Sequence, residues 1–136
     1  LQMYDEELLR ARIATQTGYS TELSLESNID LTDEITSVPK IFVGHIGIRL
    51  REPGFLWADG YSEVENRQII LTNIQILCER SSLTTVRNNV RSAYKDYSPI
   101  ANSEYSSIIF IEASVAAVTK NKIWWIEQVG VVFPGI

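Results

Sequence analysis

The C-terminal part of the chain constrains the fold most, because it reads as two long strands joined by a short polar connection. Ser107–Val118 and Ile123–Phe133 are rich in β-branched and aromatic residues, and Lys120, Asn121 and Lys122 connect them. Residues of these types favour strands, and strands joined so closely pair antiparallel. The sequence therefore predicts a β-hairpin over these residues.

Two more strands are predicted upstream. Lys40–Leu50 follows a proline and has apolar residues on both of its faces. In Gln68–Cys78 the residues alternate between an apolar face and a more polar one. A short strand is also expected at Thr21–Ser27. Asp30 is expected to cap a single helical turn that reaches Ile35. Gly44 and Gly47 predict a β-bulge or a close approach of another segment to the backbone.

Two helices complete the expected fold. The first runs from about Tyr4 to Gln16 and ends at Gly18; the second runs from Leu83 to Tyr97 and begins with an N-cap at Ser81 or Ser82. A helix between strands that otherwise follow one another predicts an α+β domain over residues 1–136. We expect a small, mostly antiparallel, mixed sheet of about four strands, with the two main helices packed on one face.

Charge and cysteine content exclude several classes of protein. The net charge of −5 opposes general affinity for nucleic acid, although it would suit a surface that DNA slides past without binding. Glu112, Lys120 and Glu127 interrupt the most apolar region, so we expect no membrane span. Cys78 is the single cysteine, which rules out a disulfide framework and predicts synthesis in the cytoplasm.

The sequence offers little for catalysis or metal binding. His45 is the only histidine and lies within an apolar strand, where a packed side chain is the simplest interpretation. Cys78 has neither a CxxC partner nor a neighbouring histidine and reads as a small buried hydrophobe. We therefore expect no catalytic residue, no metal and no cofactor, and a protein that is not an enzyme.

Side chains for protein contacts are easier to find. Arg87, Arg91 and Lys95 form a basic stripe on the second helix, which either faces an acidic partner or is a solvated surface. Trp124 and Trp125 are consecutive in a strand, so they point to opposite faces. One of them, for which we take Trp124, is expected to contact another helix, loop or subunit.

The long connection from Arg51 to Arg67 is unusually rich in large aromatic and apolar residues for a loop. It contains Phe55, Leu56, Trp57 and Tyr61 among several carboxylates. Aromatic side chains bordered by charge are typical of interface anchors, although the same loop could fold back over its own core. We take these four residues as candidate contacts with another protein.

The order of these elements resembles the phage tail terminator, or tail-completion, proteins, a group that includes the lambdoid minor tail protein U. The matching pieces are an amphipathic first helix, a proline-led strand, a strand that runs into a helix, and a closing hairpin. They lie at Glu6–Ile13, Val38–Val43, Ile74–Cys78 with Leu83–Tyr97, and Val131–Pro134. No catalytic motif contributes to this resemblance.

The resemblance implies a structural virion protein of the tail or neck, assembled in the host cytoplasm. Such a subunit forms a ring, usually six-fold, that caps the tail tube, ends tail polymerisation and offers a surface for head-tail joining. Its expected partners are further copies of itself, the tail tube protein, and the sheath and head-tail connector proteins. DNA would only pass through the lumen.

Two alternatives remain. The segment Thr17–Ser37 departs from the family pattern and allows another neck or head-tail connector protein of similar fold. A small-ligand binding domain or enzyme would instead need a pocket lined by His45, Cys78 and nearby carboxylates.

Overall fold

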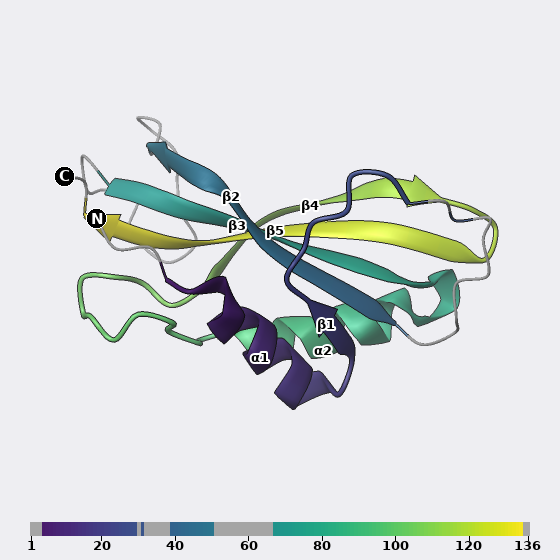
Figure 1. Ribbon diagram of the computed structural model, residues 1–136, viewed down its shortest axis with the longest axis horizontal. Coiled ribbons are helices and arrows are strands. Elements are labelled where there is room, and N and C mark those ends of the chain that lie inside the picture. Colours follow the sequence, from purple (N-terminus) through teal and green to yellow (C-terminus); the bar gives the residue numbers. More distant parts are fainter. Residues whose placement is uncertain (1–3, 30, 32–38, 51–66, 135–136) are drawn as a thin grey trace.

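A five-stranded sheet covered on one face by two helices forms the body of the molecule (Figure 1). The computed structural model describes residues 4–29, 31, 39–50 and 67–134. The strands are β1 (Ser20–Glu22), β2 (Lys40–Leu50), β3 (Arg67–Glu79), β4 (Ile109–Val118) and β5 (Lys122–Pro134). Their spatial order is β1-β2-β3-β5-β4, and every pairing is antiparallel except β1 with β2. The predicted α+β class is confirmed, with one strand more than expected.

The helices begin and end at residues that suit those positions. They are α1 (Glu6–Thr17), a single 3₁₀ turn η2 (Arg80–Ser82), and α2 (Leu83–Tyr94). Asp5 caps α1 by accepting a hydrogen bond from the Glu7 N–H, and Gly18 ends it in the left-handed conformation with φ of 75°. Ser82 occupies the N-cap position of α2, as predicted, but its side chain makes no capping hydrogen bond, and the 3₁₀ turn leads into the helix.

The second helix is three residues shorter than predicted. It ends at Tyr94, and Asp96 has a φ of 60°, which right-handed helical backbone cannot adopt. Its buried residues Val86, Val90 and Ala93 lie at helical spacing, and that stripe packs on the sheet beside α1.

The main core lies between the helices and the sheet. Leu9 and Ile13 of α1 and Val90 of α2 are fully buried there, opposite the alternate residues of β3 and β5 such as Ile74 and Val129. Because side chains alternate along a strand, the neighbouring residues of β3 and β5 point to the other face of the sheet.

A segment that follows β1 crosses part of this second face, as the dark trace in Figure 1 shows. Its Glu26 backbone pairs with the Gln75 side-chain amide through two hydrogen bonds of 2.9 Å. The side chain of Leu25 lies over Gly44, where a Cβ atom would come within 2.7 Å of Leu25 Cγ. The predicted close approach at Gly44 is therefore confirmed, and the register of β2 shifts between His45 and Gly47 as a bulge requires.

Candidate interaction surfaces

A buried carboxylate organises the surface formed by α2, β4 and β5. Glu127 of β5 has no exposed surface, because its side chain points toward the helices and not to solvent. Arg87 Nε donates to Glu127 Oε1 at 2.6 Å, and Arg91 Nε donates to the same oxygen at 3.1 Å. The Tyr94 hydroxyl donates to Oε2 at 2.8 Å, and Trp125 Nε1 donates to Oε1 at 3.2 Å. Four donors thus satisfy the carboxylate, as a buried charge requires.

The spacing of α2 explains why both arginines reach one carboxylate. Arg87 and Arg91 are four residues apart, so they lie on the same side of the helix and stand above β5. Each guanidinium also covers an aromatic ring, since Arg87 Cζ is 4.6 Å from the Trp125 ring centre and Arg91 Cζ is 4.4 Å from that of Phe110. Burial raises the pKa of Tyr94, so its hydroxyl stays a hydrogen-bond donor to the carboxylate.

The basic stripe predicted on α2 therefore has two parts. Arg87 and Arg91 bind a carboxylate of their own chain, while Lys95 at the end of α2 is exposed. No sequence pattern points to Glu127 as the partner of these arginines, because they lie 40 and 36 residues earlier in the chain.

A hollow lies beside this network, between the end of α2 and the start of β4. It has a volume of about 440 Å³ and most of its wall is apolar. Arg91, Lys95 and Asp96 line it from the helix side, and Phe110 lines it from β4. Phe110 is 41% exposed although the Arg91 guanidinium covers one face of its ring, and Lys95 lines the same hollow.

Exposed apolar side chains gather on the two outer long strands of the sheet. Of the large hydrophobic residues exposed within the described ranges, five lie on β2 or β4. They are Ile46, Ile48, Phe110, Val115 and Val118. Isolated apolar residues on a surface are ordinary, but residues of this kind along both edges of a sheet mark surfaces suited to burial against another protein.

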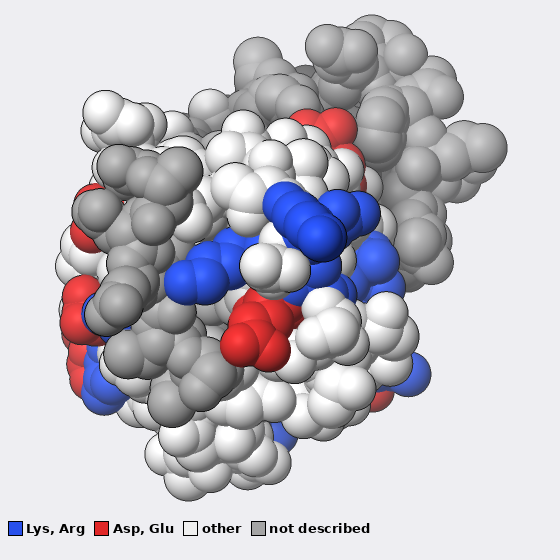
Figure 2. Space-filling view, turned by 90° about the vertical axis from the view of Figure 1, so that its right-hand side faces the viewer, with Lys and Arg blue, Asp and Glu red and all other residues white. Residues whose placement is uncertain are grey.

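The end of the molecule that carries the β4–β5 turn is basic. Figure 2 looks onto this end and shows Lys and Arg side chains gathered around a few acidic ones. A polar hollow of about 330 Å³ is lined there by Glu79, Lys120 and Lys122, and Arg80 donates to the Thr119 carbonyl beside it. The overall net charge of −5 is thus unevenly distributed.

His45 is a packed strand histidine, as predicted. Its Nδ1 lies 2.8 Å from Thr72 Oγ1, and its Nε2 lies 2.8 Å from the Tyr4 carbonyl oxygen. Because a carbonyl oxygen only accepts hydrogen bonds, the proton is on Nε2. The Tyr4 hydroxyl also contacts Thr72 Oγ1, at 2.5 Å, and burial raises the pKa of Tyr4.

The alternative of a pocket lined by His45 and Cys78 does not form. His45 pairs with Thr72 of β3, and Cys78 lies six residues further along that strand, or about 20 Å away. Burial raises the pKa of the Cys78 thiol to about 11, which disfavours the reactive thiolate.

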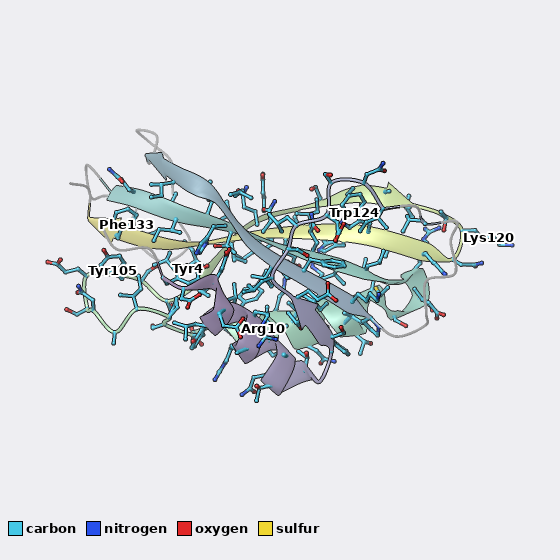
Figure 3. The ribbon with its side chains drawn as sticks, viewed as in Figure 1. Tyr4, Arg10, Tyr105, Lys120, Trp124 and Phe133 are labelled. Carbon is cyan, nitrogen blue, oxygen red and sulfur yellow. The ribbon has the colours of Figure 1, made fainter. Side chains whose placement is uncertain are left out.

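Trp124 lies on the face of the sheet away from the helices, as Figure 3 shows. It is 8% exposed and packs with Leu31, Phe42 and Leu77, so its own chain covers the side chain that we expected to contact a helix, loop or subunit. The candidate contacts Phe55, Leu56, Trp57 and Tyr61 lie outside the described residues.

Comparison with known proteins adds no assignment. No family model matches the chain, and no curated protein matches it. Within the ranges that the structure describes, no group of three His, Cys, Asp or Glu side chains could hold a metal ion. Neither α1 nor α2 combines the length and apolarity that a bilayer-spanning helix needs.

Proposed function

We propose that this chain is a structural subunit of a phage tail terminator. In this role it forms a ring with further copies of itself, caps the tail tube and ends its polymerisation, and offers a surface for joining the head connector. It acts by contacts alone and uses no cofactor.

One observation carries the proposal, namely the exposed apolar residues along both lateral edges of the sheet. Phe110, Val115 and Val118 are between 41% and 51% exposed on β4, and Ile46 and Ile48 are 44% and 39% exposed on β2. Burying the exposed part of each side chain would contribute on the order of 1 kcal/mol. A subunit with such residues on two opposite sides gains most from a closed ring, because every copy then buries both sides.

The fold and the charge support the same role. A first helix that buries Leu9 and Ile13, a strand that runs through a 3₁₀ turn into the second helix, and a closing hairpin follow one another in the order of the tail terminator resemblance. A net charge of −5 suits a ring whose lumen DNA passes without binding. The remaining expected partners, the tail tube, sheath and connector proteins, follow from the resemblance.

The mass of the purified protein tests the proposal. We expect light scattering after size exclusion to show a closed oligomer at high protein concentration or on addition of the tail tube protein, and negative-stain images to show rings. A protein that remains monomeric under both conditions would contradict the proposal.

A further inference from the structure

The two lateral sides of the molecule differ in charge. We call the side with β4 and α2 the β4 flank, and the side with β1, α1 and the outer edge of β2 the β1 flank. They lie at opposite ends of the strand order β1-β2-β3-β5-β4 and therefore face away from each other. Each copy thus carries two different surfaces, which is the arrangement that head-to-tail association uses.

The β4 flank is positive in its helical layer. Arg87, Arg91 and Lys95 supply three positive charges there, whereas Glu127 and Asp96 supply two negative ones. Glu127 is fully buried beneath the arginines, so the charge exposed in this helical layer is mainly cationic, while the one exposed carboxylate of β4 itself is Glu112. The hollow between Lys95 and Phe110 offers that surface an apolar wall with positive charge at its rim.

The β1 flank is negative. Glu6 and Glu7 stand in the first turn of α1, and Glu22 is exposed on β1. Asp5, the exposed N-cap of α1, adds a fourth carboxylate. The cations beside them are Arg10, which is paired with Glu7, and the exposed Lys40 of β2, which stands opposite Ser20 of β1. Four carboxylates against two cations make this flank complementary to the other.

Strand pairing between copies is disfavoured on both flanks. β4 has two register shifts against β5, between Phe110 and Glu112 and between Val115 and Ala117, and bulges of this kind spoil an edge for continued pairing. At the other edge, side chains of α1 already form hydrogen bonds with backbone groups of β1 and β2. The His45 N–H donates to Glu6 at 2.7 Å, and Arg10 donates to the Thr21 carbonyl at 3.3 Å.

We infer that consecutive copies of this chain associate head to tail through side chains, with the β1 flank of one copy seated on the β4 flank of the next. Carboxylates of the first turn of α1 meet the cations around Lys95, and the exposed apolar residues of the two outer strands are buried between the copies. The inference rests on the proposed ring and names its self-interface.

Contact between two β4 flanks is the competing arrangement. It would place Lys95 and Arg91 of one copy near the same cations of its partner, and like charges brought together at an interface oppose binding. It would also leave both β1 flanks in water. The charge distribution therefore favours unlike flanks over like ones.

Charge reversal tests the inference without touching the Glu127 network. An acidic variant carries Asn88→Glu and Lys95→Glu on exposed positions of α2, and a basic variant carries Glu7→Lys and Glu22→Lys. A third protein carries all four substitutions, which exchanges the charges of the two flanks. The matched control, Ser81→Glu with Lys120→Glu, makes the same charge change as the acidic variant at the basic end of the molecule.

Sedimentation velocity at low and high salt gives the readout, with circular dichroism to verify that each variant is folded. We expect the acidic and basic variants to self-associate about tenfold more weakly than the native protein at low salt, with a smaller difference at high salt. The control and the four-substitution protein should both associate as the native protein does.

Each other outcome overturns the inference in a recognisable way. If the native protein assembles and every variant assembles equally well, the flanks are not the contact, but the proposed ring stands. If the four-substitution protein fails to recover, the contact joins like flanks or other surfaces. If the native protein stays monomeric alone and on the tail tube, the proposed function fails together with the inference.

Discussion

Replacing Glu127 by glutamine should destabilise the monomer more than any exposed carboxylate replacement. Glutamine keeps the size of the side chain and one acceptor oxygen, but it removes the negative charge that Arg87 and Arg91 share. Its amide group also adds donors where Tyr94 and the arginines already donate. At least one of these donors then faces another donor within a buried site.

The size of the effect follows from burial. Breaking a buried ion pair by removing one partner costs about 3–5 kcal/mol. The two arginine side chains are 28% and 34% exposed, so water can partly solvate them once the carboxylate is gone. We therefore expect a loss of about 2–3 kcal/mol in the free energy of unfolding, which for a domain of this size lowers Tm by about 10 °C.

Urea unfolding followed by tryptophan fluorescence measures this loss. The midpoint should fall while the slope m stays unchanged, because the native fold is retained. Glu112→Gln on β4 is the control, since that carboxylate is exposed and its replacement should change stability by less than about 0.5 kcal/mol. A loss below about 1 kcal/mol for Glu127→Gln would refute the view that the shared carboxylate holds α2 on the sheet.

Three further predictions concern other parts of the monomer. Gly44→Ala should push Leu25 off the sheet, costing about 1–3 kcal/mol and speeding cleavage by a Glu-specific protease after Glu26; an unchanged cleavage rate would contradict the close approach. Cys78 should resist iodoacetamide at pH 8 in the native protein and react after unfolding, because burial raises its thiol pKa to about 11; equal rates measured by mass spectrometry would refute this. Because burial raises the pKa of Tyr4 above its unfolded value, stability should be constant below about pH 10 and fall above it, as urea midpoints would show, and Tyr4→Phe should lessen that fall.

Local pattern was enough to predict the two helices and the four long strands, whereas the short strand predicted at Thr21–Ser27 spans only Ser20–Glu22. β2 occupies Lys40–Leu50 as predicted, and β3 and β5 extend one residue beyond each predicted end. Period-two alternation and helical spacing are properties of neighbouring residues, so they can be read without knowing the fold. The end of α2 was predicted three residues late, because Tyr97 continues the apolar spacing although the backbone turns at Asp96.

The candidate surface was predicted only in part. Arg87, Arg91 and Lys95 were recognised as a stripe, but their pattern allowed both a solvated face and a partner surface. Trp124 and Trp125 were placed on opposite faces of the sheet, but their spacing did not show which of them the chain itself covers. The structure packs Trp124 against Leu31 and Phe42 and sets Trp125 under Arg87.

The sequence by itself determined that this chain folds as one helix-covered, mostly antiparallel sheet, because the periodicity of its apolar residues permits few other arrangements. Only the tertiary structure decided that Glu127, which looked like a charge interrupting an apolar strand, is the buried centre to which two arginines of α2 bind. Only it placed the carboxylates of the first turn of α1 on the β1 flank and the cations of α2 on the β4 flank. The physical reason is that pairing between charges distant in the chain depends on strand register and on how the helix docks. Neither can be read from the pattern of neighbouring residues.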